Sequence, residues 1–182
     1  MKNMRLIKPD INYKDEYLDM LFEWKKSGEE LVPWVLNLDC TDFNSMVEKI
    51  NGWSNGAGLP DGFVECSVFW LVNNNKLIGA IDIRHRLTEA LTFRGGHIGY
   101  GIRPSERKKG YASMMLSLGL KECKELGLSK VLITCSKRNV GSYKTIINNG
   151  GILDSEDIEN GVMFQRYWIT LYIPTRTVSY GG

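Results

Sequence analysis

A run of basic residues lies between a predicted strand and a predicted helix, and its residue types suit anion binding. Arg107, Lys108 and Lys109 lead into Gly110, after which an amphipathic pattern begins near Tyr111. The first backbone N–H groups of a helix have no internal acceptor, and the helix dipole adds positive potential there. Because glycine has no Cβ, a ligand can approach the main chain closely. The segment therefore predicts a receptor for a pyrophosphate or another polyanion.

Two familiar phosphate-binding motifs do not account for this segment. After Gly99 and Gly101 the sequence has Arg103-Pro104 where a Rossmann fingerprint needs its third glycine. No GxxxxGK[ST] loop occurs in the chain. A basic triplet alone would indicate only a solvated loop before a helix. Here the preceding strand, the glycine at the turn and the following helix favour the anion site.

The same stretch resembles the acetyl-CoA-binding motif of the GNAT superfamily of N-acetyltransferases, Arg/Gln-x-x-Gly-x-Gly/Ala, which matches Arg107-Lys-Lys-Gly-Tyr-Ala112. The strand that ends in Ile102-Arg-Pro104 resembles the family stretch whose main chain pairs with pantetheine. Downstream, Asn139-Val-Gly-Ser142 followed by Asn148-Asn-Gly-Gly151 is similar to the second coenzyme A motif of the family. Together these matches cover about residues 64–172, and the first of them resembles a bacterial subgroup of predicted acetyltransferases.

The resemblance implies a fold, a co-substrate and a set of binding residues. The fold is α/β (α+β), with a mixed, mostly antiparallel central sheet, helices on both faces and an N-terminal helical cap. Acetyl-CoA is the implied co-substrate, and no metal is expected. The residues implied for coenzyme A are Gly101, Ile102, Arg103, Arg107, Lys108, Lys109, Gly110, Tyr111, Ala112, Ser113, Asn139 and Ser142.

Three residues are candidates for the proton transfers that acetyl transfer to an amine requires. Related enzymes often have glutamate where this sequence has His97, and an imidazole with a pKa of about 6.5 suits a general base. The alternative is that His97 is a hydrogen-bonded strand residue. The family tyrosine that protonates the leaving thiolate falls at Ile146. Tyr143, about one helical turn earlier, and Tyr100 are therefore the candidate acids, although Tyr100 is also expected as a core residue or a wall of the acetyl pocket.

The resemblance also implies a backbone N–H donor for the developing oxyanion, on the strand that contains Gly99 and Gly101. Two glycines so close together favour an irregular backbone or a bulge at this point. A positioned donor of this kind is typically worth about 2.7–4 kcal/mol.

The acceptor side has fewer signals. The consecutive Arg84, His85 and Arg86 end a predicted strand where family acceptor grooves open, so they are expected to bind an acceptor carboxylate or phosphate. The alternative is an exposed strand end paired with Glu89. Trp34 follows a proline and is expected either in the core or as a wall of the acceptor site. Cys135 ends a strand near the reaction centre, so an acetyl-cysteine route is an alternative to direct attack.

The elements that position these residues follow from hydrophobic periodicity. Helices are predicted for about residues 13–26, 43–53, 111–126 and 140–149, the second after the N-cap candidates Thr41 and Asp42. Strands are predicted for about residues 64–72, 77–83, 97–102, 131–135, 152–154 and 162–172. The glycine-rich residues 51–62 are predicted to form a loop.

Length and charge limit the class of protein. The 182 residues predict one domain, with a helical cap and loop over 1–62, a coenzyme-binding core over 63–173 and a tail over 174–182. A net charge of +2 excludes binding of nucleic acid or membrane through bulk charge. The four cysteines lack zinc-site spacing, and the first residues lack a signal-peptide stretch. Free thiols in a reducing cytoplasm are therefore expected.

The leading hypothesis is an N-acetyltransferase that moves an acetyl group from acetyl-CoA to a primary amine by direct attack in a ternary complex. A catalytically inactive coenzyme A-binding regulatory module is the alternative. A small basic nucleic-acid binder is a third hypothesis, which the near-neutral charge opposes. Small amines, peptide N-termini and lysine side chains all remain open as acceptors, and so does a homodimer.

Overall fold

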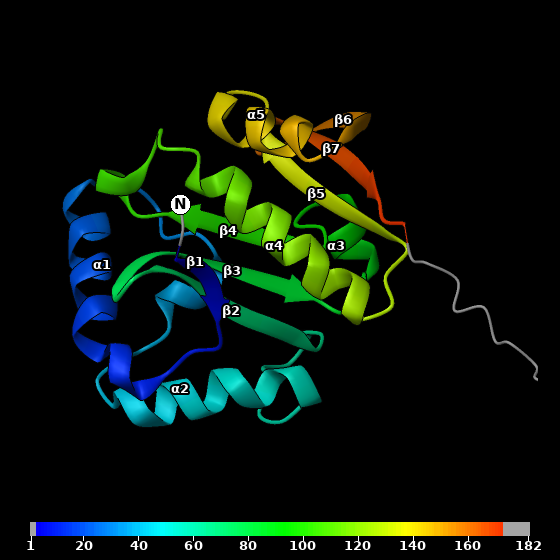
Figure 1. Ribbon diagram of the computed structural model, residues 1–182. Helices are drawn as coiled ribbons and strands as arrows, with labels where there is room; N and C mark the ends of the chain where they lie inside the picture. The colour runs from blue at the N-terminus through cyan, green and yellow to red at the C-terminus, as the bar shows by residue number, and fades with distance from the viewer. Residues whose placement is uncertain (1–2, 173–182) are drawn as a thin grey trace, which may run out of the picture.

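Two antiparallel sheets, which meet at β4 and β5, form the framework of the chain (Figure 1). The computed structural model describes residues 3–172. Within them one sheet has the order β1-β2-β3-β4 and the other β5-β7-β6. The strands are β1 Met4–Ile7, β2 Cys66–Asn73, β3 Lys76–Arg84, β4 Ile98–Ile102, β5 Lys130–Ser136, β6 Ile152–Glu159 and β7 Val162–Thr170. The helices are α1 Lys14–Lys26, α2 Phe43–Gly52, α3 Glu89–Phe93, α4 Tyr111–Glu125 and α5 Val140–Asn148.

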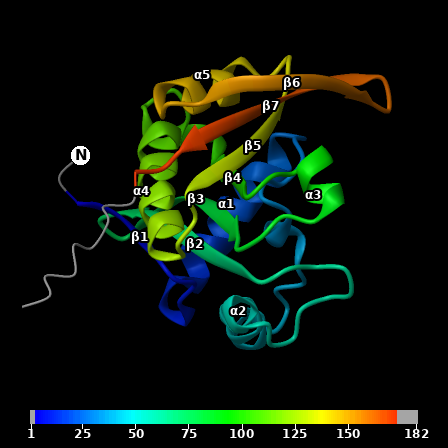
Figure 2. The same cartoon turned by 90° about the vertical axis from the view of Figure 1, so that its right-hand side faces the viewer.

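The first sheet is buried on both faces, which explains the continuous apolar sequence of β2. Phe69 and Leu71 belong to the core beneath α4, whereas Val68 and Trp70 belong to the core beneath α1 and α2. Figure 2 shows α4 on one side of this sheet and α2 on the other. Because side chains alternate along a strand, one apolar run supplies both cores.

The two sheets are joined just before β4 and then separate. In residues 3–172 an isolated bridge joins Gly96, which precedes β4, to Ile133 of β5. Next to it the His97 N–H donates to Leu132 O at 2.8 Å, and His97 Nδ1 accepts from the Leu132 N–H at 3.0 Å. Past this point β4 pairs only with β3, so one edge of β4 is left open.

The glycines of β4 allow a loop to lie against the strand. A Cβ at Gly101 would overlap Val32 O and the Trp24 ring, and a Cβ at Gly99 would overlap the Asp82 carboxylate. The expected bulge at these glycines is not found, because β3 and β4 pair in unbroken register from Gly79–Ile102 to Ile83–Ile98. Close packing, rather than irregular backbone, is what requires glycine here.

The fold class predicted from the sequence is confirmed, and so are the principal helices and strands. Asp42 caps α2 as expected, since its side chain accepts from the Ser45 N–H. Three features were not predicted: the strand β1, the short helix α3 and the division of the strands into two sheets. The predicted tail, 174–182, lies outside the described residues. None of the helices in residues 3–172 has both the length and the apolar character needed to cross a membrane.

Candidate active site

The start of α4 has the geometry of an anion receptor. Gly110 is the N-cap residue with φ 81°, a left-handed conformation that glycine adopts without strain. The first N–H of α4 with a backbone acceptor is that of Met114, which donates to Gly110 O at 3.2 Å. Within residues 3–172, the N–H groups of Tyr111, Ala112 and Ser113 have no acceptor, so they are free for a ligand oxygen.

Two of the three basic side chains before α4 are held by internal ion pairs. Lys109 Nζ lies 2.9 Å from a carboxylate oxygen of Glu106. Arg107 pairs with Glu29 at 2.6 Å and donates from Nε to Ile102 O at 2.9 Å. Lys108 is the member of the triplet that forms no ion pair with any described residue. The positive potential at this corner therefore comes chiefly from backbone N–H groups and Lys108.

Arg103 was predicted among the coenzyme-binding residues, but its side chain is turned into the protein. It is only 3% exposed and forms ion pairs with Asp19 and, at 2.6 Å, with Glu23 of α1. It also donates to Leu77 O at 3.3 Å. The guanidinium thus fastens α1 to the end of β4. The main chain of Arg103 is also paired, since its N–H donates to Ile78 O and its carbonyl oxygen accepts from the Glu106 N–H, both at 3.0 Å. This corrects the expectation for its side chain.

A cavity of about 230 Å³, here called the splay cavity, opens where β4 and β5 separate. Among its lining residues are Ile98 and Tyr100 of β4, Thr134 and Cys135 of β5, and the start of α5. The Tyr100 hydroxyl bridges the cavity to Ser142 Oγ at 2.9 Å. Burial raises the pKa of Tyr100 to about 12, so this hydroxyl stays protonated.

Asn139 and Ser142 hold the start of α5 beside the splay cavity. Asn139 is the N-cap residue, and its Oδ1 accepts from the Ser142 N–H at 3.0 Å. Ile146, at the position of the family tyrosine, is fully buried and belongs to the core. Tyr143 is 42% exposed, with its ring 6.2 Å from that of Tyr167, and does not line the cavity. The structure therefore brings Tyr100 into the site and leaves Tyr143 outside it.

His97 lies at the junction of the sheets and does not line the splay cavity. It is 6% exposed, and its Nδ1 is already occupied by the Leu132 N–H. Burial lowers the pKa of His97 to about 4, with Arg84 adding to the effect. A buried imidazole of such low basicity is poorly suited to accept a proton from an amine. We therefore replace the hypothesis of a His97 base with that of a residue that joins β4 to β5.

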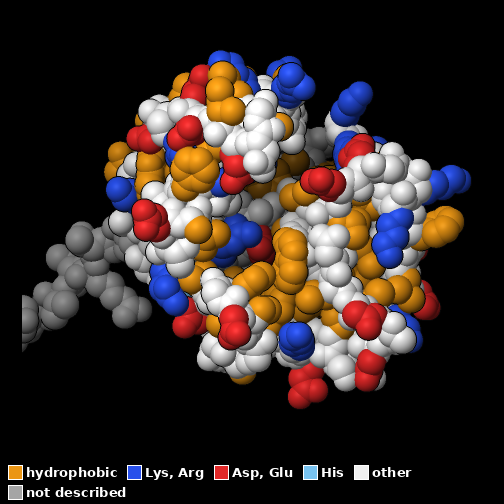
Figure 3. All heavy atoms as spheres, turned by 180° about the vertical axis from the view of Figure 1, so that it is seen from behind, with side chains coloured by type: hydrophobic (Ala, Val, Ile, Leu, Met, Phe, Trp, Pro, Cys, Tyr) orange, Lys and Arg blue, Asp and Glu red, His pale blue; other side chains and the backbone are white. Residues whose placement is uncertain are grey.

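A second cavity of about 260 Å³, here called the aromatic pocket, adjoins the splay cavity. Its walls include Trp34, Trp53 and Phe63, and Trp34 and Arg84 line both cavities. Arg84 pairs with Asp82 at 3.0 Å on the floor, where the Asp82 carboxylate also accepts from the Gly99 N–H at 2.8 Å. In Figure 3 a basic and an acidic side chain lie side by side in a hollow among hydrophobic ones.

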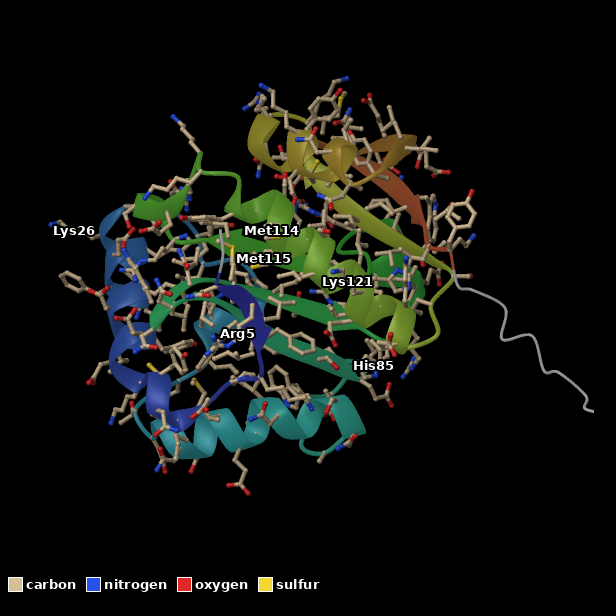
Figure 4. All side chains as sticks on the ribbon, viewed as in Figure 1. Arg5, Lys26, His85, Met114, Met115 and Lys121 are labelled. Atoms are coloured by element: carbon tan, nitrogen blue, oxygen red, sulfur yellow. The ribbon has the colours of Figure 1, made fainter. Side chains whose placement is uncertain are left out.

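The three consecutive basic residues do not act as one cluster. Arg84 reaches both cavities and also donates to Gly95 O and Gly96 O at 3.3 and 3.2 Å. His85 Nε2 lies 2.9 Å from Ser67 Oγ, and Figure 4 shows His85 at the end of β3, away from Met114 at the start of α4. Arg86 pairs with Glu65 at 3.2 Å rather than with Glu89. Of the triplet, only Arg84 is placed to meet an acceptor.

Sequence reasoning missed Asp82 as a residue of this site, and it did not predict the burial of the Cys135 thiol. Asp82 interrupts an otherwise apolar strand, and that interruption was the available signal. Burial raises the pKa of Asp82, while Arg84 opposes the shift. Cys135 does line the splay cavity, but burial raises the pKa of its thiol, which disfavours the thiolate that an acetyl-cysteine route requires.

Among residues 3–172 no three His, Cys, Asp or Glu side chains gather as a metal site would require.

Comparison with known proteins identifies the family of this architecture. Residues 11–151, more than half of the chain, match the family model of the acetyltransferase (GNAT) domain. No curated protein sequence matches the chain.

Several solved structures share the fold over nearly their whole length. One is an acetyltransferase from Salmonella typhimurium that modifies the N-terminal serine of 50S ribosomal subunit protein L7/L12, with TM-score 0.66, 15% identity, and coverage of 94% of this chain and 97% of that one. RimL, a ribosomal L7/L12 α-N-protein acetyltransferase in complex with coenzyme A, has TM-score 0.70, 14% identity, and coverage of 94% and 96%. The microcin C7 self-immunity acetyltransferase MccE, in complex with acetyl-CoA and AMP, has TM-score 0.67, 17% identity, and 94% coverage of both chains. At these identities the likeness concerns the fold.

Proposed function

Because this chain belongs to the GNAT acetyltransferase family, we propose that it transfers the acetyl group of acetyl-CoA to a primary amine by direct attack in a ternary complex. The observation that carries this function is the presence of two sites, one for an anion and one for a thioester, with the open edge of β4 between them. Free N–H groups open α4, and the splay cavity lies beyond the open edge of β4. The structures of related enzymes with coenzyme A or acetyl-CoA support the choice of co-substrate.

The residues present suit the parts of this co-substrate. The N–H groups of Tyr111, Ala112 and Ser113, with Lys108 beside them, would hold the diphosphate. The Ile102 N–H faces away from β3 on the open edge of β4 and would donate to pantetheine. Bound there, acetyl-CoA supplies an acetyl thioester to the splay cavity.

The open edge of β4 supplies the donor for the thioester oxygen. The Arg103 N–H donates to Ile78 O on β3, at 3.0 Å. Because backbone N–H groups alternate in direction along an antiparallel strand, the N–H of Tyr100, like that of Ile102, faces away from β3. We assign the Tyr100 N–H as the hydrogen-bond donor to the developing oxyanion. Such a donor lowers the activation free energy by about 2.7–4 kcal/mol.

The proton leaving the amine needs a base, and Asp82 is the carboxylate placed for it. It lies on the floor of the aromatic pocket and is bonded to Gly99, which lines the splay cavity. Burial raises its pKa, which makes it a stronger base than an exposed carboxylate, while Arg84 favours its ionised form. As the amine nitrogen bonds to the acetyl carbon and the carbon–sulfur bond breaks, Asp82 takes the proton and Tyr100 donates a hydrogen bond to the leaving sulfur.

Release of free thiol from acetyl-CoA in the presence of a panel of primary amines tests this function. Amine-dependent release, with one N-acetyl product formed per thiol, is the expected result. Binding of acetyl-CoA in calorimetry without release for any amine would instead favour the inactive regulatory module. A cytoplasmic location stays a prediction, supported by the buried and unpaired Cys66, Cys123 and Cys135.

A further inference from the structure

We propose that the aromatic pocket receives an aromatic ring of the acceptor, so that the acceptor is a primary amine with a ring one or two carbons away. This inference rests on the proposed acetyl transfer and narrows it to one class of substrate. The pocket is lined by residues of the N-terminal cap and the segment that follows it, by β2 and β3, and by the start of α3.

Three aromatic side chains make the pocket suitable for a flat apolar group. Phe63 stacks at a tilt on Trp34, with ring centroids 5.0 Å apart, and lies 6.4 Å from Trp53. Trp53 is fully buried and is anchored by its indole N–H, which donates to Gly58 O at 3.1 Å. Trp34 and Phe63 are 49% and 42% exposed, although both lie against a cavity. A ligand ring would cover these exposed faces in the tilted arrangement that aromatic groups prefer.

The charges in the pocket are matched, which argues against a charged tail on the acceptor. Asp82 and Arg84 pair on the floor, and burial raises the pKa of Cys66 to about 12, so its thiol is neutral. An extra carboxylate or ammonium would have to be desolvated beside a pair that is already neutral, and this is costly. An amine with a neutral ring avoids that cost.

The position of the pocket directs the amine toward the thioester. Trp34 and Arg84 line both cavities, so a ring in the aromatic pocket places a short substituent at the boundary with the splay cavity. Asp82, the proposed base, lines the aromatic pocket, and its carboxylate accepts from the N–H of Gly99, which lines the splay cavity. The volume of about 260 Å³ is below the roughly 300–1,000 Å³ of pockets for drug-sized ligands. A single ring on a short linker is the size that follows.

The test compares 2-phenylethylamine with 2-cyclohexylethylamine and ethanolamine in the thiol-release assay. We expect kcat/KM for 2-phenylethylamine to exceed that for each of the other two by at least about tenfold. Phe63→Ala should lower kcat/KM for 2-phenylethylamine about tenfold and leave that for ethanolamine within about twofold. The matched control is Phe22→Ala, since Phe22 is 69% exposed on α1 and lines neither cavity, and it should change neither value.

The outcomes separate this inference from the function on which it rests. Thiol release that is equal for all three amines and unaffected by Phe63→Ala would overturn the aromatic class and leave acetyl transfer in place. If no amine causes release of thiol, the proposed acetyl transfer is wrong. Calorimetric titration of 2-phenylethylamine into the protein then tests separately whether the pocket binds the ring. Binding that Phe63→Ala abolishes and Phe22→Ala preserves would uphold the pocket, and absence of binding would overturn it.

Discussion

Replacing Tyr100 by phenylalanine removes one hydroxyl from the splay cavity and keeps the ring that packs against the core. The lost group is the one that bonds Ser142 Oγ at 2.9 Å and is assigned to the leaving sulfur. Because phenylalanine fills the same space, we expect a loss of stability of only about 1 kcal/mol, the usual value of one hydrogen bond.

The size of the catalytic effect follows from the pKa of the tyrosine. Burial raises that pKa to about 12, whereas an ordinary thiol has a pKa of about 8.5. At about 1.4 kcal/mol per pKa unit, full proton transfer to the thiolate is uphill by roughly 5 kcal/mol. Tyr100 therefore donates a hydrogen bond rather than its proton. Loss of such a positioned donor costs about 2.7–4 kcal/mol, so kcat should fall about 10²–10³-fold.

Steady-state thiol release, with calorimetry for acetyl-CoA, measures this effect. The affinity for acetyl-CoA should stay within about threefold of wild type, since the diphosphate site is at α4. In the wild type, the raised pKa keeps the hydroxyl protonated through the ordinary tyrosine value of about 10, so kcat should show no basic limb there. Tyr143→Phe, outside the cavity, is the comparison and should retain kcat. A wild-type kcat in Tyr100→Phe, or a loss confined to Tyr143→Phe, would refute the assignment.

The other predictions concern the anion site, the base and the buried arginine. Ala112→Asp puts a carboxylate in the first turn of α4, where the helix tolerates it. It should lower the affinity for acetyl-CoA at least about tenfold in calorimetry, whereas Ala112→Ser should not. In the wild type, kcat should fall as the pH drops through the raised pKa of Asp82, because protonation removes the base. Asp82→Asn should lower kcat about 10²–10⁴-fold and abolish this fall of kcat at low pH. Arg103→Met should lower the free energy of unfolding by about 1.5–3 kcal/mol in urea titration, because it removes hydrogen bonds to charged partners, with unchanged acetyl-CoA affinity in the folded protein. Equal stability would contradict its role as an anchor.

Features that depend on neighbouring residues could be predicted from the sequence. The strand, basic turn and helix around Gly110 form a contiguous stretch, so the free N–H groups at α4 follow from the order of residue types. The cap at Asp42 and the buried strand β5 were predictable for the same reason.

Features that join distant segments could not be predicted in this way. The partner of His97 is Leu132, and the partners of Arg103 are Glu23 and Asp19, 80 and 84 positions away in the chain. The sequence marks both residues as polar and well placed for chemistry, but burial and those partners make them structural. The aromatic pocket likewise needs the N-terminal cap to fold over β3, and periodicity alone does not indicate that arrangement.

A crystal structure of the protein with acetyl-CoA tests the central claim most directly. We expect the diphosphate on the N–H groups of Tyr111, Ala112 and Ser113, and the thioester in the splay cavity with its oxygen at the Tyr100 N–H. A coenzyme bound away from the start of α4, or a thioester directed outside the gap between β4 and β5, would contradict the account.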